Sequence, residues 1–242
     1  MNLVIDIGNT RVKAALYKDD LFEDLRIFDT LDELLKDTIL LQSAKNIIVG
    51  SVVDKLDDFY RSLKAYAPTL VFSTETKIPL TNLYHSAATL GSDRLSASVA
   101  AYFLQPDSDV LVVDAGTCIK YNFTNAKNEY LGGGISPGIR MRFKALHNYT
   151  SKLPLIGITE NRIDLIGTNT QNSILSGVIN GAIAEIDGFI NDYKLQYPGI
   201  LVLLTGGDSE FLAKRLKNSI FAHQNLVLKG LNDILNYNLA NP

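Results

Sequence analysis

Short apolar runs alternate with amphipathic stretches along the first half of the chain. Residues 2–8 and 11–18 show the period-two alternation of β-strands and are joined by a tight turn, and residues 21–28 predict a third strand. The expected elements that follow are a helix at 31–43 with Asp29 and Thr30 as candidate caps, a strand at 46–53, a helix at 56–67, a strand at 69–74 and a helix at about 92–104.

The second half of the chain repeats this plan. Residues 109–123 form an apolar strand, a turn and a second alternating strand. The expected elements that follow are further strands to about 136, helices near 138–150 and 170–196, a buried strand at 199–207 and helices near 209–217 and 225–239. Strands alternating with helices predict an α/β protein.

Two of the expected hairpins carry the same polar residues. The stretches VIDIGNTRVKAAL and VVDAGTCIKYNF share Asp, then Gly, then Thr, then a nearby Lys, with a gap of one residue between them. Chance similarity of two hairpins is the alternative, but the matching order of the elements after each hairpin favours a duplication. The sequence therefore predicts two α/β domains, at residues 1–107 and 108–242.

Composition and charge narrow the class of protein. Hydrophobic residues make up 46% and charged residues 20% of the 242 residues, as in globular proteins with a sizeable core. The net charge of −3, without a basic cluster, argues against nucleic acid or an anionic membrane as a partner. No apolar run approaches the roughly 18–20 residues that cross a bilayer, no signal-peptide pattern opens the chain, and the single cysteine, Cys118, fits a reducing compartment. We expect a cytoplasmic protein.

The paired turns are suited to binding phosphate. Turns rich in Gly, Asn and Thr present N–H groups and hydroxyls with little bulk, and Gly8 and Gly116 let a phosphate approach the backbone. The Asp at each strand end supplies oxygen to a hard cation, and Lys13 adds a positive charge. Ordinary hairpin turns explain either motif alone, whereas the two in register favour a nucleoside triphosphate with its metal.

Two further motifs admit a structural and a functional interpretation. In GSDR, Ser92 or Asp93 can cap the following helix. Alternatively, Asp93 can act as a general base toward a phosphoryl acceptor while Arg94 binds a carboxylate. In TGGD (205–208), the glycines can admit a flat ring or a phosphate. Alternatively, Asp208 or Ser209 only caps the next helix.

Together these residues resemble a known family. The stretches DIGNTRVK, GSDR, DAGT, GGGISPGIRMRFKALHNYTSKLP, GTNTQNSILSGVINGAI and TGGD occur in the order and spacing of type III pantothenate kinases. DIGNTRVK combined with GSDR is specific, whereas DAGT or GG alone is not. The resemblance implies duplicated ribonuclease-H-like domains of the actin/sugar-kinase/Hsp70 superfamily with a cleft between them. It also implies ATP-dependent phosphorylation of pantothenate to 4′-phosphopantothenate, the first step of coenzyme A biosynthesis.

The resemblance also assigns a role to each motif. It implies that Asp93 is the catalytic base, that magnesium lies near Asp6, and that Asp114 binds the potassium or ammonium ion that the family requires. The implied ATP-binding residues are Asp6, Ile7, Gly8, Asn9, Thr10, Arg11, Val12, Lys13 and Thr117. The implied pantothenate-binding residues are Tyr84, Gly91, Ser92, Asp93, Arg94 and Thr170.

The resemblance further implies a homodimer with its sites close to the interface. Segment 170–197 is a candidate for that interface, and an internal core helix is equally compatible with its apolar positions Ile174, Val178, Ile186 and Phe189.

Two positions depart from the family's pattern. Ser92 stands where the family often has Ala, and Lys120 stands where small or hydroxyl residues are common, so its ammonium group could compete with potassium. Two alternatives stay open, namely another small-metabolite kinase of the superfamily and a nucleotide-gated regulatory protein. The regulator would not need GSDR, and replacing Asp93 would leave its activity intact.

Overall fold

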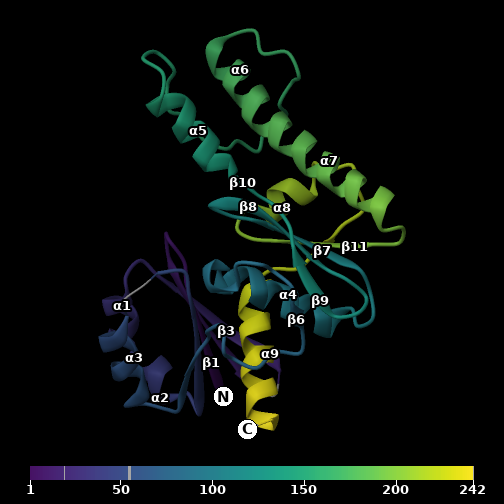
Figure 1. Cartoon of the computed structure of the whole chain (residues 1–242). Coiled ribbons are helices and arrows are strands. Elements are labelled where there is room, and N and C mark those ends of the chain that lie inside the picture. Colours follow the sequence, from purple (N-terminus) through teal and green to yellow (C-terminus); the bar gives the residue numbers. More distant parts are fainter. Residues whose placement is uncertain (19, 54–55, 242) are drawn as a thin grey trace. The chain divides into compact units, whose positions relative to one another are not determined.

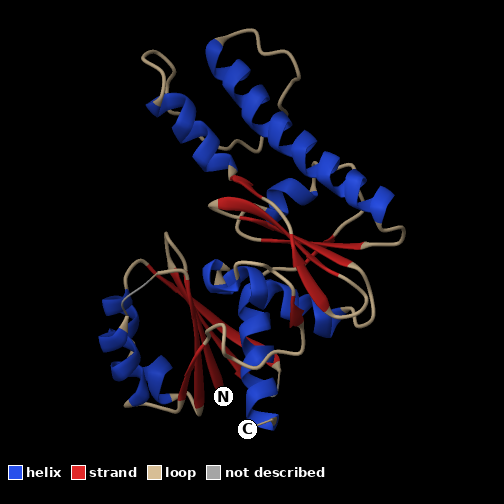
Figure 2. Ribbon diagram, viewed as in Figure 1, coloured by secondary structure: helices blue, strands red, loops and turns tan. Residues whose placement is uncertain are grey.

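A computed structural model describes residues 1–18, 20–53 and 56–241. The described chain divides into two compact units, shown along the sequence in Figure 1 and by secondary structure in Figure 2. The first comprises residues 1–107, 124–131 and those from Asn225 onward, and the second comprises residues 108–123 and 132–224. The last helix therefore belongs with the first unit, whereas the sequence pattern assigned it to the second.

The first unit is built on a five-stranded sheet in the order β3-β2-β1-β4-β5. Strand β2 is antiparallel to both β1 and β3, and β4 is parallel to both β1 and β5. The bounds are β1 (Asn2–Ile7), β2 (Val12–Lys18), β3 (Leu21–Phe28), β4 (Asn46–Ser51) and β5 (Thr69–Val71). These strands confirm the pattern read from the apolar runs of the first half.

Helices cover both faces of this sheet, as Figure 1 shows. One face buries apolar side chains of α1 (Leu31–Lys36), α2 (Thr38–Gln42) and α3 (Asp57–Lys64). The other face packs against α4 (Ser92–Leu104) and α9 (Leu226–Ala240). These two helices come so close that a Cβ at Gly230 would lie 1.8 Å from the carbonyl oxygen of Ser96. Glycine at that position therefore permits the contact that fixes α4.

The single helix expected at 31–43 is divided at Asp37. Thr30 caps α1 by accepting a hydrogen bond from the N–H of Glu33, and Asp37 caps α2 by accepting one from the N–H of Leu40. At Asp37 the backbone leaves the helical region, with φ −81° and ψ 70°. A side chain that caps the next helix also ends the previous one, which the apolar spacing alone does not reveal.

The second unit has the strand order β12-β11-β7-β8, with β10 paired to β8. Its strands are β7 (Val110–Ala115), β8 (Cys118–Thr124), β10 (Ile135–Pro137), β11 (Leu201–Thr205) and β12 (Phe221–Ala222). Its helices are α5 (Ile139–Asn148), α6 (Thr170–Leu175), a π-helical turn (Ser176–Asn180), α7 (Gly181–Gln196) and α8 (Ser209–Ala213). Short elements that were not expected are β6 (Thr81–Asn82), a 3₁₀ turn (Ala87–Thr89) and β12, while β9 (Glu129–Gly132) falls among the strands expected before 136.

The two sheets share an arrangement. In the first unit, the β1–β2 hairpin is followed across the sheet by the parallel strands β4 and β5. In the second, the β7–β8 hairpin is followed by the parallel strands β11 and β12. The repeated order supports the duplication inferred from the two hairpin sequences.

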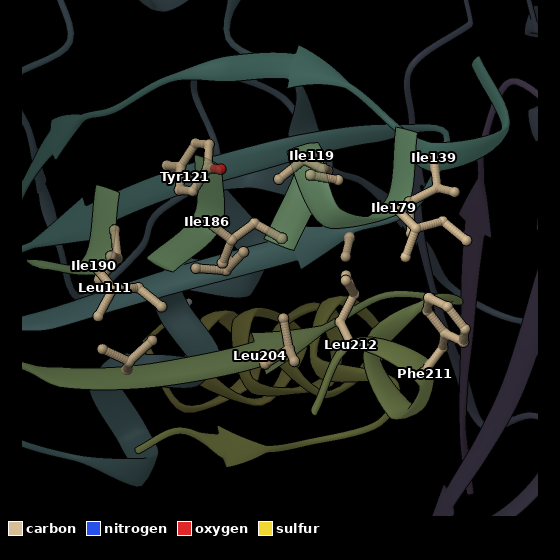
Figure 3. Packing of buried hydrophobic residues seen from close by; sticks show 14 of the residues in the cluster. Leu111, Ile119, Tyr121, Ile139, Ile179, Ile186, Ile190, Leu204, Phe211 and Leu212 are labelled. Atoms are coloured by element: carbon tan, nitrogen blue, oxygen red, sulfur yellow. The ribbon is translucent and has the colours of Figure 1, made fainter. Parts of the chain in front are cut away.

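The long helix of the second unit is a core helix. Ile179, Ile186 and Ile190 pack against sheet residues such as Leu111 and Tyr121, as Figure 3 shows. Ile174 and Val178 belong to the same buried cluster, and Phe189 stacks on Tyr121 with ring centroids 4.3 Å apart. The core interpretation is therefore confirmed for Ile174, Val178 and Ile186, whereas Phe189 is 40% exposed.

The same helix corrects one expectation from the sequence. Residues Thr170–Gln196 form 27 helical residues that are long and apolar enough, by length and composition, to cross a membrane. The earlier statement that no apolar run approaches this length was therefore wrong. The core helix of a globular protein can meet this criterion of length and composition, because the face that it buries against a sheet is strongly apolar.

Candidate functional site

The first hairpin exposes a polar turn beside a pair of charged residues. The N–H of Gly8 donates to the carbonyl oxygen of Arg11 at 3.1 Å and closes the turn. The register then places Asp6 opposite Lys13. Both lie on the sheet face that carries Val4 and packs against α4 and α9, because side chains alternate along a strand. The turn residues Asn9, Thr10 and Arg11 are exposed. The exposed turn therefore lies on the surface beside the Asp6–Lys13 pair.

The GSDR segment begins α4 next to the end of β4. The hydroxyl of Ser92 donates to the carbonyl oxygen of Ser51 at 2.9 Å, and Oδ1 of Asp93 accepts from the N–H of Arg94 at 2.8 Å. Gly91 is the cap residue of α4, without a side-chain cap hydrogen bond, so neither Ser92 nor Asp93 caps the helix. A Cβ at Gly91 would lie 2.6 Å from Oδ1 of Asp93. A side chain at position 91 would therefore have to displace the Asp93 carboxylate from this position.

Arg94 is held under an aromatic ring. Its side chain is largely buried, with the residue 5% exposed, and its guanidinium carbon lies 5.4 Å from the ring centroid of Tyr84. Tyr84 in turn packs against Tyr130, and its N–H donates to the side chain of Asn82 at 3.0 Å. The first unit thus brings Tyr84 and Arg94 together, although they are ten positions apart in the sequence. A cation over a ring face gains both packing and electrostatic stabilisation.

The second hairpin repeats the first with a shorter turn. The N–H of Gly116 donates to the carbonyl oxygen of Cys118 at 3.0 Å, so this turn has one residue fewer than the Gly8–Arg11 turn. The missing residue explains the one-residue gap between the two sequence motifs. In each hairpin, an Asp and a Lys lie on opposite strands, two positions before and two positions after the residues of the turn-closing hydrogen bond. They are Asp6 and Lys13 in the first hairpin, and Asp114 and Lys120 in the second. Lys120 Nζ is 2.7 Å from Asp114 Oδ2.

Two glycines pack against the backbone of this second turn. Gly206, with φ +96°, follows β11, and a Cβ there would lie 2.3 Å from the carbonyl oxygen of Ala115. Gly138 precedes α5, and a Cβ there would lie 2.3 Å from the carbonyl oxygen of Gly116 and 2.4 Å from that of Thr117. A side chain at either position would clash with the hairpin backbone, so the two glycines allow TGGD and the start of α5 to approach the second turn closely.

Asp208 of TGGD is buried and ion-paired. It is 3% exposed, its Oδ1 pairs with Nη1 of Arg140, and no described residue donates to its Oδ2. It precedes α8 but makes no side-chain cap hydrogen bond. Arg140 was not predicted from the sequence. Its position in the first turn of α5 could have indicated an ion pair, because a cation there is disfavoured by the helix dipole and needs an acidic partner.

A half-buried carboxylate ties α5 to α7. Burial alone would raise the pKa of Glu185, but hydrogen bonds from Arg142 and Ser136 outweigh it and hold the pKa below its usual range. Nη2 of Arg142 donates to Oε2 of Glu185 at 2.6 Å, and the hydroxyl of Tyr121 donates to Oε1 at 3.2 Å. Burial raises the pKa of Tyr121 above its usual range, so the hydroxyl keeps its proton and acts as a donor. This network is a structural support rather than a reaction site.

Comparison with known sequences decides the family. The model of the type III pantothenate kinase family matches residues 2–192. A type III pantothenate kinase from Flavobacterium johnsoniae is 39% identical over the full length of both chains. Another from Phocaeicola vulgatus is 44% identical over 98% of this chain and 99% of its own. The chain belongs to the type III pantothenate kinase family. The resemblance read from DIGNTRVK and GSDR is therefore confirmed.

Solved structures agree on the fold of this type III pantothenate kinase family member. A protein from Campylobacter jejuni described as a Baf family transcriptional activator superposes with a TM-score of 0.68 at 23% identity, covering 98% of this chain and 99% of its own. An N-acetylmannosamine kinase from Listeria monocytogenes gives 0.56 at 13% identity, with shares of 98% and 99%. The expected fold of the actin/sugar-kinase/Hsp70 superfamily is confirmed.

The residues expected at the kinase site fall into separate groups. The first unit brings together Tyr84 and the segment Gly91–Arg94, and it carries the Asp6–Lys13 hairpin on the same sheet. The second unit carries Asp114 and Thr117 on its own hairpin. Thr170 is exposed as the first residue of α6, after the cap residue Asn169. The roles of these residues stay predictions.

Proposed function

We propose that this chain transfers the γ-phosphoryl group of ATP to the terminal hydroxyl of pantothenate, giving 4′-phosphopantothenate and ADP. This reaction is the first step of coenzyme A biosynthesis. The observation that carries the proposal is the cluster at the start of α4. Ser92 is hydrogen-bonded to the end of β4, the Asp93 carboxylate accepts from the N–H of Arg94, and the Arg94 guanidinium lies over the Tyr84 ring. The full-length similarity to type III pantothenate kinases supplies the substrate.

Asp93 acts as the general base in this proposal. The substrate oxygen attacks the γ-phosphorus, the bond from that phosphorus to the β–γ bridging oxygen breaks, and ADP leaves. The proton of the hydroxyl passes to the Asp93 carboxylate as the new bond forms. The backbone N–H of Arg94, at 2.8 Å from Oδ1, orients the carboxylate. A positioned acid–base group contributes roughly 10²–10⁴ in rate.

Arg94 binds the carboxylate of pantothenate. A guanidinium group matches a carboxylate with two parallel hydrogen bonds, which a lysine cannot supply. The Tyr84 ring restricts the orientation of this guanidinium and lines the pocket. Gly91 and Ser92 complete the binding segment, and Thr170 contributes from α6 of the second unit.

ATP is bound through the two hairpins. Asp6, Ile7, Gly8, Asn9, Thr10, Arg11, Val12 and Lys13 bind the phosphates from the first hairpin, and Thr117 contacts the nucleotide from the second. Magnesium fits beside Asp6, because this ion takes one or two carboxylates and completes its shell with phosphate oxygens and water. Within the described part of the chain, no three His, Cys, Asp or Glu side chains gather to hold a metal by themselves, which suits an ion that arrives with ATP. When bound, magnesium neutralises charge on the phosphates.

The remaining expectations concern the cation, the assembly and the compartment. The family resemblance supports a homodimer, and the second unit exposes large apolar side chains that a partner subunit would cover, among them Leu155, Leu165, Ile166 and Leu195. The small net charge and the single cysteine support a cytoplasmic enzyme that uses neither nucleic acid nor membrane. The residue expected to bind the potassium or ammonium ion is Asp114. Its carboxylate is paired with the ammonium group of Lys120.

The test is ADP release that depends on both ATP and pantothenate, measured for the wild type, Asp93→Asn and Asp57→Asn. Asp57 is a matched control because it lies exposed in the first turn of α3, as Asp93 lies in the first turn of α4. We expect turnover in the wild type and the control, and a loss of about 10² or more in Asp93→Asn.

Two other outcomes have definite meanings. Activity that survives in Asp93→Asn would leave the kinase assignment standing and remove the role of Asp93 as base. Absence of turnover with pantothenate, in protein that still binds ATP, would refute the substrate assignment. That result would favour the alternative of a nucleotide-gated regulator or a kinase for another small metabolite.

A further inference from the structure

The carboxylate expected to bind a monovalent cation already has a cation beside it. Lys120 Nζ lies 2.7 Å from Asp114 Oδ2, and the two side chains are 17% and 11% exposed. That distance is typical of a charge-assisted hydrogen bond between ammonium and carboxylate. Lys120 lies on β8 and Asp114 on β7, the two strands of one hairpin. A closed hairpin therefore sets their separation.

The surroundings of Asp114 leave little need for a second positive charge. Its Oδ1 lies against bare backbone, 2.6 Å from where a Cβ of Gly206 would stand and 3.9 Å from that of Gly116. Its Oδ2 is on the ammonium of Lys120. The ammonium group therefore already supplies positive charge to this mostly buried carboxylate, in the position that a bound potassium ion would take. A potassium site built on Asp114 therefore does not fit the residues that surround it here.

We propose that the side chain of Lys120 takes the place of the monovalent cation, so that this enzyme works without added potassium or ammonium. The inference deepens the proposed kinase function and rests on it. The chemistry is equivalent, because the end of a lysine side chain is an ammonium group attached to the protein. Attachment also removes the cost of recruiting a free ion, since the charge is always present at the carboxylate.

Lys120 acts as a positioning residue in this proposal. Its charge neutralises Asp114 and holds the two strands of the hairpin together beside Thr117, which contacts ATP in the proposed function. The neighbouring strand β10 pairs with β8 at this point, with Ile135 opposite Lys120, so the lysine is fixed from both sides. Removing its charge would free the Asp114 carboxylate to take up a potassium ion.

The experiment compares the wild type with Lys120→Met, which keeps the length of the side chain and removes its charge. Lys144→Met is the matched control, because Lys144 is exposed on α5 of the same unit. Pantothenate-dependent ADP release is measured with sodium or tetramethylammonium as the other monovalent cation, at an ionic strength of about 0.1 M, with and without potassium or ammonium.

We expect the rate of ADP release by the wild type and by Lys144→Met to change less than about twofold when potassium is added. Without potassium, the rate of ADP release by Lys120→Met should be roughly 10–100-fold lower than that of the wild type. Losses of this size are typical for residues that hold a ligand-binding residue in place without touching the ligand. Potassium or ammonium should restore much of that loss. A wild type that needs potassium as strongly as Lys120→Met does would overturn the proposal.

A second measurement does not depend on turnover. The melting temperature of each variant is followed as potassium replaces sodium, because an ion that binds only the folded protein raises it. We expect a potassium-dependent rise for Lys120→Met and none for the wild type. If no variant phosphorylates pantothenate, the proposed function fails, and the melting experiment still decides whether Lys120 occupies the cation position. If Lys120→Met does not fold, the response of the wild type to potassium decides it.

Discussion

The hydroxyl of Ser92 donates a hydrogen bond to the carbonyl oxygen of Ser51 at 2.9 Å and so joins the first turn of α4 to the end of β4. The bond is made just before the proposed base, Asp93. However, α4 is also held along its length by α9, with Gly230 against the backbone of Ser96. The position of Asp93 therefore has two supports, of which the helix packing is the larger.

Ser92→Ala should consequently affect stability more than catalysis. We expect the free energy of unfolding to fall by about 1 kcal/mol, the usual contribution of one hydrogen bond, while kcat stays within about twofold. Urea unfolding and steady-state kinetics on the same preparation measure both effects. A large loss of kcat with little loss of stability would show that the Ser92 bond, and not the helix packing, positions Asp93.

Arg94→Lys should raise the KM for pantothenate. Lysine keeps the charge but loses the planar pair of donors and the stacking on Tyr84, so we expect an increase of roughly 10–100-fold in KM with a smaller change in kcat. Arg61→Lys on the exposed surface of α3 is the matched control. Pantothenyl alcohol, which has a hydroxyl in place of the carboxylate, separates the explanations. If Arg94 binds the carboxylate, this analogue is used equally poorly by both proteins.

Gly206→Ala should destabilise the second unit, whereas Gly207→Ala should not. Gly206 has φ +96°, and its Cβ would meet the carbonyl oxygen of Ala115, while a Cβ at Gly207 meets nothing within 4 Å. We expect a loss of about 1–3 kcal/mol for the first variant and a change within about 0.5 kcal/mol for the second. Thermal unfolding measures the difference. Equal melting temperatures for the two variants would contradict the close approach of TGGD to the second hairpin.

Much of this site could be predicted from the sequence because its residues lie close together along the chain. Asp6, Gly8 and Lys13 occur within one hairpin, and alternation along two strands suffices to bring Asp6 opposite Lys13. The GSDR segment likewise carries its residues on one turn of helix. Such short-range patterns follow from backbone geometry, which local sequence largely decides.

The features that were missed depend on long-range packing or on single side chains. Arg140 and Asp208 form their ion pair across 68 positions of sequence, and only the fold brings α5 to the start of α8. The placement of α9 against α4 follows from the close contact at Gly230, which no local pattern indicates. Asp37 divides one expected helix, because its side chain caps α2 at a position where the apolar spacing alone would continue the helix.

The last prediction concerns acid stability and the half-buried carboxylate of Glu185. Burial alone would raise its pKa, but hydrogen bonds from Arg142 and Ser136 hold the pKa below its usual range in the folded protein. A carboxyl group with a lowered folded-state pKa stabilises the protein fully above its unfolded value, about 4.3 for Glu. That stabilisation is lost as the pH falls through the lower, folded value.

Glu185→Gln should therefore be less stable than the wild type at pH 7, by about 1–3 kcal/mol, because Arg142 loses its charged partner. The difference should shrink as the pH is lowered below about 4, because the wild type then loses the same interaction by protonation. Urea unfolding of both proteins across that range measures it, with the exposed Glu75→Gln as control. A difference that stays constant from pH 7 into the acid range would mean that the carboxylate charge of Glu185 is not what stabilises the contact between α5 and α7.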